Sequence, residues 1–339
     1  MLQMQINLKA ILNNINKIHQ ISNKKVIPVI KSNAYNLGDI EVGKYLSDHG
    51  INCLAVVDIE EAKRLLEAQI TADILVLNGI FPHEMEFCEQ NPNLILSVNS
   101  YKEALDIVEH CSVDNLRVHL QIETGMNRLG IKSVEECKEV IALLKSAKVK
   151  IKGIYTHFSS LNNLEKQESE FKKYLSLYKF EMVHCAATST YRFATIGNFV
   201  RVGLQIYGFE TNDDFTQALT IYTKPIAINN IKAQETVGYN EAFIAPKDMS
   251  VAVLPIGYSN GYSRNLSGFV VFAEGKRYPV IGRVCMNHLF VAVDNKVNME
   301  TKFYITCSEL PIKEIATYLN TIEHDVLCMF HIKDREYLR

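Results

Sequence analysis

Residues 26–35 read V-I-P-V-I-K-S-N-A-Y, and this stretch decides the fold that we predict. A short apolar run rich in β-branched residues is typical of a buried strand. Lys31 leaves this predicted strand at its carboxyl end, where a rigid element fixes the amine and a polar turn follows. An amine held in this way can form a Schiff base with a carbonyl group. A surface lysine at the end of a strand is the alternative that this segment alone leaves open.

The first two thirds of the chain alternate between short apolar runs and stretches with helical periodicity. Strands that alternate with helices at this spacing indicate βα units and a parallel sheet, and eight of them suit a (β/α)8 barrel of the TIM type over residues 1–218. A doubly wound sheet is the alternative, but it favours a glycine-rich turn after its first strand, and S-N-A-Y-N-L-G is not one. The predicted strands are 26–30, 53–57, 74–77, 94–98, 116–122, 151–155, 182–185 and 199–202, and two clear helices are 59–68 and 134–147.

The remainder, residues 219–339, has a different texture. Its apolar runs are short and are separated by Gly, Asn or Lys, which predicts a mostly antiparallel β domain. The predicted strands are 226–231, 250–255, 269–272, 278–281 and 289–293, with one late helix at 312–319.

Composition restricts the class of partner. The 339 residues include 36 Lys and Arg against 38 Asp and Glu, so no strongly basic face for nucleic acid is indicated. The eight cysteines show no C-x-x-C pair, and we expect no metal site. The chain begins without a secretory signal and has no apolar run long enough to cross a membrane. We therefore expect a cytoplasmic protein with reduced cysteines and a small-molecule substrate.

Polar residues follow several of the predicted barrel strands. In such barrels functional groups collect at the carboxyl ends of the strands. A lone histidine at a strand end is more often a structural hydrogen-bonding group, but an ordered set on one rim is much harder to obtain by chance. The set comprises Lys31, Tyr35, Arg128, His157, Thr188, Ser189, Arg201 and Gly203.

One combination on this rim is chemically specific. A lysine that can form a Schiff base suits an aldehyde cofactor, and the hydroxyls of Thr188 and Ser189 can bind phosphate oxygens together with backbone N–H groups. Gly203 allows the backbone to approach closely. Pyridoxal 5'-phosphate is the cofactor with these requirements.

Seven motifs, in order, together resemble the alanine racemase family, which comprises fold-type III pyridoxal phosphate enzymes. The resemblance implies a barrel followed by a β domain, a homodimer with shared active sites, and interconversion of L-alanine and D-alanine, with D-alanine serving cell-wall synthesis. The motifs are V-I-K-S-N-A-Y, E-T-G-M-N-R-L-G, Y-T-H-F, R-V-G-L-Q-I-Y-G, V-G-Y-N, P-I-G-Y-S-N-G and I-G-R-V-C-M-N.

The resemblance also implies roles for individual residues. Lys31 would carry the cofactor and act as the base on one face of the substrate, and Tyr258 of the partner subunit would be the base on the other face. An arginine at the pyridine nitrogen hardly gives up a proton, so that nitrogen would stay unprotonated. The implied contacts are Tyr35, Thr188, Gly203 and Leu204 at the phosphate, His157 and Arg201 along the ring, and Arg128 with Met286 at the substrate carboxylate or cofactor hydroxyl.

Four positions depart from the family pattern. Gln121 stands at a frequent lysine, and its neutral amide oxygen can still accept from Arg128, but with less charge. Ala187 stands at a common asparagine, Asn287 at a usual aspartate and Ile332 at a common tyrosine. These changes leave a serine racemase, a broad-specificity racemase or a degenerate cofactor-binding protein as alternatives to an alanine racemase.

Two further classes share only part of the pattern. A decarboxylase of basic amino acids typically places a carboxylate at the ring nitrogen, so Arg201 argues against that class. A non-catalytic pyridoxal phosphate carrier resembles only the barrel, so the second domain with Tyr258 argues against it.

Overall fold

The computed structural model describes residues 2–110, 116–209 and 215–339, which form two compact units. The barrel unit contains residues 12–34 and 38–206. The sheet unit contains the chain up to Ile11, residues 35–37 and the chain from Tyr207 onward. In the described residues, no helix combines the length and the apolar character that a membrane span requires.

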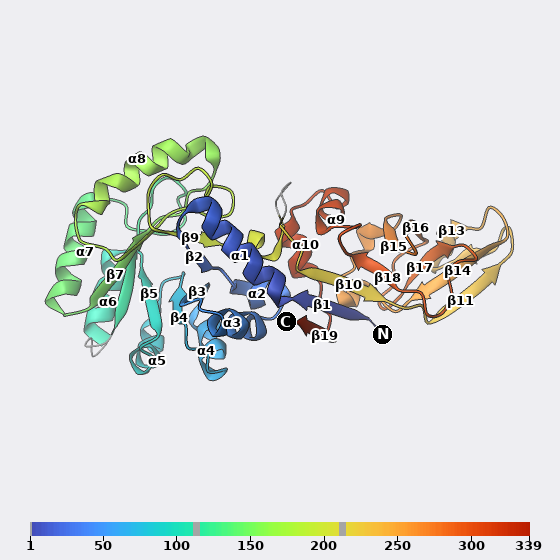
Figure 1. Cartoon of the computed structure of the whole chain (residues 1–339), viewed down its shortest axis with the longest axis horizontal. Coiled ribbons are helices and arrows are strands. Elements are labelled where there is room, and N and C mark those ends of the chain that lie inside the picture. The colour runs from blue at the N-terminus through green and yellow to red at the C-terminus, as the bar shows by residue number, and fades with distance from the viewer. Residues whose placement is uncertain (1, 111–115, 210–214) are drawn as a thin grey trace. The chain divides into compact units, whose positions relative to one another are not determined.

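The barrel unit contains one parallel sheet of eight strands (Figure 1), as the spacing of the apolar runs predicts. Its strand order is β2-β9-β8-β7-β6-β5-β4-β3. The two edge strands meet beyond β2, where the N–H of Ile30 donates to the carbonyl of Ala55 at 2.9 Å, so the barrel is nearly closed. The strands are β2 (Lys25–Pro28), β3 (Cys53–Val56), β4 (Asp73–Val76), β5 (Leu94–Val98), β6 (Arg117–Gln121), β7 (Lys150–Tyr155), β8 (Met182–His184) and β9 (Phe199–Val202).

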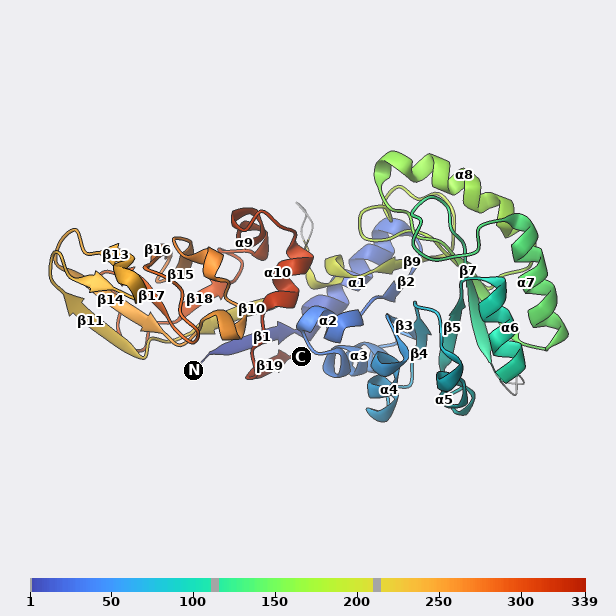
Figure 2. The same ribbon diagram turned by 180° about the vertical axis from the view of Figure 1, so that it is seen from behind.

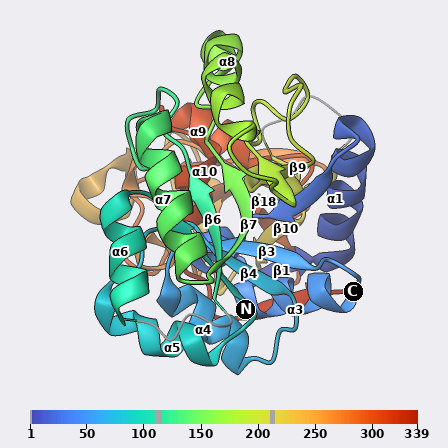
Figure 3. The same cartoon turned by 90° about the vertical axis from the view of Figure 1, so that its left-hand side faces the viewer.

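Helices separate these strands, except that none lies between β8 and β9 in the described residues. Helices α6 and α7 lie over the outside of the sheet (Figure 3). Both faces of the strands are covered, which is why they appear in the sequence as unbroken apolar runs. Side chains from β2 to β5 fill the interior, with Ile27, Ala55, Leu75 and Ile95 in one buried cluster. The helices are α1 (Leu8–Ser22), α3 (Asp39–Asp48), α4 (Ile59–Glu67), α5 (Met85–Gln90), α6 (Tyr101–His110), α7 (Val134–Ser146) and α8 (Leu164–Leu175).

The sheet unit contains a nine-stranded sheet in the order β11-β14-β17-β16-β15-β18-β10-β1-β19 and a small hairpin, β12-β13. Helices α9 (Ile312–Tyr318) and α10 (Glu323–Met329) belong to this unit. The strands are β1 (Gln3–Asn7), β10 (Leu219–Thr223), β11 (Ala227–Ile231), β12 (Thr236–Val237), β13 (Phe243–Ile244), β14 (Met249–Leu254), β15 (Val270–Ala273), β16 (Lys276–Ile281), β17 (Leu289–Val293), β18 (Phe303–Thr306) and β19 (Arg335–Leu338).

Strand β1 is one of several elements of this unit that our sequence analysis did not predict; the others are β10, β12, β13, β18, β19 and α10. Strand β1 lies between β10 and β19, antiparallel to the first and parallel to the second (Figure 2). Its five residues, Q-M-Q-I-N, bury only Met4 and Ile6, so the apolar signal is too short to identify a strand. The first residues of the chain thus complete the sheet of the C-terminal region.

The segment that carries Lys31 is a turn of left-handed helix, α2 (Lys31–Asn36). Five consecutive residues, Ser32 to Asn36, have φ between +53° and +67°. A left-handed helical conformation costs about 1–2 kcal/mol for each residue with a Cβ atom, and Asn tolerates it best. Strain of this kind persists only where the surroundings over-determine the backbone, and it is concentrated at functional sites.

Glu61 is one of the groups that hold this turn in place. Its side chain is buried on α4, and its two carboxylate oxygens accept from the N–H of Ser32 at 2.5 Å and of Val57 at 2.9 Å. Burial raises the pKa of Glu61, and these two N–H donors oppose the rise. The carboxylate therefore fixes the first residue after Lys31 to the beginning of a barrel helix.

We expect the effect of a glycine substitution to reverse sign between the left-handed turn and an ordinary helix. Ser32 is exposed, so Ser32→Gly removes the Cβ clash with little loss of packing and should raise stability by about 1 kcal/mol. Ala142→Gly, at an exposed position of the right-handed helix α7, should lower stability by about the same amount. Thermal unfolding of both variants measures the two signs, and a destabilised Ser32→Gly would show that the turn is not strained at this position.

Candidate active site

The carboxyl ends of five neighbouring strands bring the predicted barrel residues to one rim. The backbone of Val29 donates to Val202 at 2.9 Å, and that of Arg201 donates to Ala186 at 3.0 Å. The backbone of Ile122 donates to Tyr155 at 2.7 Å. These bonds align the ends of β2, β9, β8, β7 and β6, which lead into Lys31, Gly203, Thr188, His157 and Arg128 respectively.

Arg201 is the buried charge of this rim. It projects from β9 with 4% of its surface exposed, and its pKa is lowered to about 10 by burial. One terminal nitrogen donates to Nδ1 of His184 at 2.7 Å and to the carbonyl of the same residue at 2.8 Å. The other donates to the carbonyl of Thr156 at 2.7 Å and lies 3.4 Å from Nδ1 of His157. Within the described ranges, no carboxylate pairs with this guanidinium.

His157 sits among three cations. Its pKa is lowered to about 3, first by burial and then by the charges of Arg201, Arg128 and Lys31. The imidazole is therefore neutral at physiological pH. Because the groups around it are cationic, this rim is suited to an anionic ligand.

The loop after β8 presents two hydroxyls. It is folded on itself, because the side chain of Thr190 accepts from the N–H of Ala187 at 3.0 Å. Thr188 and Ser189 lie at its tip, and no described residue forms a hydrogen bond with either hydroxyl. Leu204 is fully buried and begins the short helix η4 (Leu204–Tyr207) directly after Gly203. Free hydroxyls next to a glycine at a strand end are suited to phosphate oxygens.

The side chain of Gln121 contacts groups other than the guanidinium of Arg128. Its amide oxygen accepts from the hydroxyl of Tyr155 at 2.6 Å, and its amide nitrogen donates to the carbonyl of Leu129 at 3.2 Å. Arg128 is exposed, and its backbone N–H is bound by the carboxylate of Glu123 at 3.2 Å. The amide of Gln121 therefore orients Tyr155 and the loop backbone, and not the guanidinium of Arg128.

In the sheet unit, the structure brings Tyr258 and Met286 together. The N–H of Tyr258 donates to the carbonyl of Cys285 at 3.1 Å, and the N–H of Ser259 donates to that of Met286 at 3.0 Å. A Cβ atom at Gly257 would lie 2.2 Å from the carbonyl oxygen of Cys285, so only glycine permits this approach. The side chains of Tyr258 and Met286 are 43% and 54% exposed, so both are available for contacts beyond their own unit.

Two residues of the sheet unit that differ from the family pattern, Asn287 and Ile332, lie beside the turn that carries Tyr258. Asn287 donates from its amide to the hydroxyl of Ser259 at 2.8 Å, which braces the residue after Tyr258. Ile332 is buried, and the preceding residue, His331, donates from its N–H to the carbonyl of Asn260 at 3.0 Å. The segment with Ile332 therefore packs beside the turn that carries Tyr258.

Tyr35 lies in the last part of the left-handed turn, which belongs to the sheet unit. Its ring lies 5.5 Å from that of Tyr207 and 5.9 Å from that of His324. The turn α2 therefore spans the two units, with Lys31 in the barrel unit and Tyr35 in the sheet unit.

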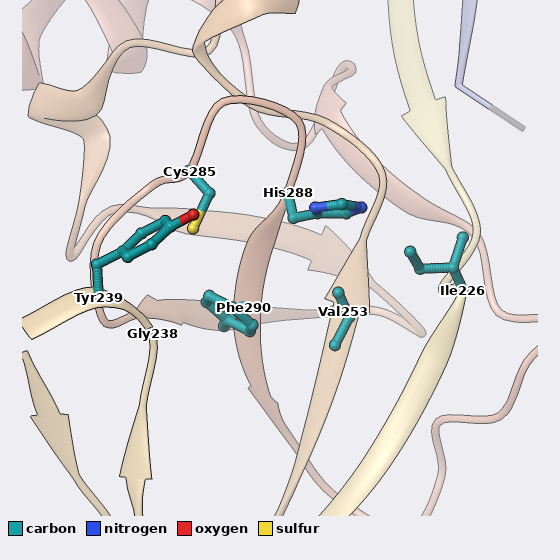
Figure 4. Close-up of a pocket in the computed structure, with 7 residues that line it drawn as sticks. All are labelled: Ile226, Gly238, Tyr239, Val253, Cys285, His288 and Phe290. Atoms are coloured by element: carbon teal, nitrogen blue, oxygen red, sulfur yellow. The ribbon is translucent and has the colours of Figure 1, made fainter. Parts of the chain in front are cut away.

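Figure 4 shows a hollow of the sheet unit that is lined in part by Cys285 and His288. Its volume is about 520 Å³. Cys285 and Tyr239 lie at one side of the hollow, and His288 and Ile226 at the other. The side chains of Tyr239 and Ile226 are 69% and 51% exposed. Tyr258 and Met286 are large exposed side chains of the same unit, and exposed apolar side chains are a feature of protein–protein contacts.

Three buried residues of the barrel unit were missed by our sequence analysis: His119, Tyr155 and His184. All three point into the interior and contact one another or Arg201. A signal was present, because a polar residue inside an otherwise buried strand needs a partner. The sequence did not show which strand supplied the hydrogen-bond partner of each residue.

Comparison with known proteins agrees with this arrangement. The chain matches the model for "Alanine racemase, N-terminal domain" over residues 6–211 and "Alanine racemase, C-terminal domain" over residues 218–336. An alanine racemase of Staphylococcus epidermidis is 31% identical over 96% of this chain and 91% of its own length.

Two solved structures are informative in different ways. Alanine racemase from Bartonella henselae with covalently bound pyridoxal phosphate has a TM-score of 0.87 and 25% identity, and 99% of each chain is covered. A histidine racemase from Leuconostoc mesenteroides has a TM-score of 0.91 over all of this chain and 98% of its own, but at 21% identity it shows the fold alone. One fold thus occurs with different amino-acid substrates.

The two domain models, the full-length relatives and the nearly closed barrel with its β sheet unit lead to one conclusion: this chain belongs to the alanine racemase family.

Proposed function

We propose that this protein is a pyridoxal phosphate-dependent amino-acid racemase that interconverts L-alanine and D-alanine. The observation that carries the proposal is that Lys31 directly follows β2 and Arg201 lies on the neighbouring strand β9, so that both belong to one cationic rim. Family membership supports the reaction class. D-alanine for cell-wall synthesis is the corresponding physiological product, and the cytoplasm is the compartment we propose.

The residues of the barrel rim fit the cofactor. When bound, pyridoxal phosphate supplies a conjugated ring that accepts electron density from the substrate Cα. Lys31 would hold it through its amine. Thr188, Gly203, Leu204 and Tyr35 would hold the phosphate, His157 would lie along the ring, and Arg201 would donate to the ring nitrogen.

Racemisation requires proton transfer on both faces of the substrate Cα. The amine of Lys31 would move the proton on one face, and the phenol of Tyr258 of the partner subunit on the other. A phenol has an ordinary pKa of about 10, so nearby cations must favour its phenolate. Arg201 and Arg128 supply positive charge at the rim, and Arg128 with the backbone of Met286 would bind the substrate carboxylate.

A homodimer with shared sites is the assembly we propose. Lys31 belongs to the barrel unit and Tyr258 to the sheet unit, and Tyr258 is exposed within its own unit. The exposed side chains of Tyr258 and Met286, on segments joined by backbone hydrogen bonds, support a protein contact at this surface. A partner subunit would bury this surface and bring Tyr258 to the barrel rim.

Serine or a broader range of amino acids is the alternative substrate class. Ile332, at a position that we align with a common tyrosine, carries no hydroxyl, and Gln121 does not orient Arg128. Both features favour a less restrictive site. Incubation of the protein with single L-amino acids, followed by assay of each D-enantiomer, decides between these substrates.

We expect alanine to racemise fastest in this assay and serine to show measurable turnover, because the site lacks the tyrosine hydroxyl and the anchored arginine. An Ile332→Tyr variant is the matched comparison, and we expect it to lower the serine-to-alanine ratio. Absence of turnover for every amino acid, with cofactor bound, would indicate a degenerate binding protein instead.

We expect the cofactor to be attached at Lys31. Borohydride reduction of the cofactor-loaded protein, followed by peptide mapping, should place the label on the peptide that contains this residue. Lys24, whose amine donates to the carbonyls of Ala194 and Ile196 at 2.7 and 2.6 Å, is the internal control and should stay unlabelled. A label on any lysine other than Lys31 would refute the assignment.

Mixed dimers test the shared active site. Lys31→Ala and Tyr258→Phe should each be nearly inactive alone. In a mixed dimer one site receives both lesions and the other receives neither, so equal amounts with free subunit exchange should restore about a quarter of the sites. If exchange is confirmed independently and activity does not return, each site is formed by one chain.

A further inference from the structure

The interior of the barrel contains a chain of hydrogen bonds that starts at Arg201 and that the reaction above does not use. Nδ1 of His184 accepts from Arg201 at 2.7 Å, and Nε2 of His184 lies 2.8 Å from Nδ1 of His119. Both imidazoles are fully buried, on β8 and β6. The chain therefore runs from the cationic rim into the core of the barrel.

The direction of every proton in this chain follows from the guanidinium. Arginine only donates, so Nδ1 of His184 must be the bare nitrogen and Nε2 must carry the proton. Nε2–H of His184 then donates to His119, whose own proton must sit on Nε2. An imidazolium at either position would set two donors against each other, so both rings are neutral.

The series of hydrogen bonds ends at His119. Nε2 of His119 is buried and has no hydrogen-bond partner in the described part of the structure. It faces Gly153, where a Cβ atom would lie 2.7 Å away, so β7 leaves room for the ring and nothing more. Burial and the charge of Arg201 lower the pKa of both histidines, which agrees with neutral rings.

Tyr155 limits the movement of the same groups from the side. Its ring stacks on that of His184 at 4.8 Å with an angle of 11° between the planes, and the guanidinium of Arg201 lies 4.8 Å from its centroid. Its hydroxyl is held at 2.7 Å by Ser97 and at 2.6 Å by Gln121. The substituted position Gln121 thus supports Arg201 through one tyrosine.

The guanidinium has one donor left. Its four terminal N–H groups are directed at His184, Thr156 and His157, while no described residue accepts from Nε–H of Arg201. We propose that His119 and His184 are positioning residues, a tautomer-locked pair that keeps Arg201 stationary with Nε–H presented to the ligand. That the ligand atom is the ring nitrogen of pyridoxal phosphate rests on the proposed function.

The role follows from what a displaced Arg201 would permit. A fixed donor that does not release its proton keeps the ring nitrogen unprotonated. If the guanidinium moved, water could protonate that nitrogen, and the ring would withdraw electrons more strongly. Proton return to the cofactor would then compete with return to Cα, and transamination would increase relative to racemisation.

The first experiment uses the full chain without cofactor. Two-bond ¹H–¹⁵N spectra should show both His119 and His184 as the neutral Nε2–H tautomer, unchanged between about pH 5 and about pH 9. The exposed histidines of the same chain provide reference signals. An imidazolium or an Nδ1–H tautomer at His184 would overturn the proposal without reference to activity.

The second experiment separates positioning from simple filling of the core. His119→Leu removes the acceptor for His184, whereas His119→Asn keeps an acceptor near the place of Nδ1. We expect the Leu variant to raise the ratio of transamination to racemisation about tenfold, the size expected for an unsatisfied buried donor, and the Asn variant to stay within about twofold of the parent. Equal ratios in all three proteins would refute the positioning role.

The two experiments also separate this proposal from the proposed function. If the tautomers are as expected but pyridoxal phosphate does not bind, the racemase proposal and the ring-nitrogen assignment fail, and the locked pair stands. If the cofactor binds and racemisation proceeds but the tautomers differ, the locked pair fails alone. If His119→Leu does not fold, His184→Asn replaces it, because asparagine keeps an acceptor for Arg201. The ratio of transamination to racemisation should rise in this variant, because the hydrogen bond to His119 is lost.

Discussion

A guanidinium buried without a carboxylate is the constraint on which this site depends. Arg201 keeps its charge inside the barrel, because carbonyl oxygens and imidazole nitrogens accept its hydrogen bonds. Neutral acceptors leave the positive charge uncompensated, so the local potential stays positive. Burial first, and then that potential, lower the pKa of His157, and the potential makes the rim suitable for anions. A carboxylate in place of His184 would satisfy Arg201 equally well and would remove this property.

The left-handed turn solves a second problem, which is how to hold Lys31. An ordinary helix after β2 would continue the chain in relaxed geometry, whereas α2 accepts five strained residues between a barrel strand and the sheet unit. The strain is offset by specific contacts, among them the carboxylate of Glu61 and the side chain of Asn33, which accepts from the N–H of Asp39 at 3.0 Å. The turn thus gains a defined position for the lysine at the cost of stability.

The sequence predicted the barrel because strands covered on both faces appear as uninterrupted apolar runs, and this physical signal is local. It did not predict β1, whose two buried residues acquire meaning only from distant partners in β10 and β19. The same reason separates Lys31, which the end of an apolar run reveals, from His119 and His184. Those two are functional candidates only because folding brings residues of three strands together. His119 on β6 lies within hydrogen-bond distance of His184 on β8, and His184 accepts from Arg201 on β9.

The family pattern is retained where the backbone leaves no choice and is relaxed where a side chain can be replaced. Gly257 approaches the carbonyl of Cys285 so closely that any Cβ atom is excluded, and the Tyr258 turn depends on that approach. Gln121, in contrast, stands where the family frequently has a lysine, and its amide oxygen accepts from Tyr155 and not from Arg128. The amide of Gln121 therefore supports the buried Arg201 through Tyr155 and does not support the exposed Arg128. A site altered in this way keeps the groups that define the reaction type and loses restraint on the group that would select the substrate.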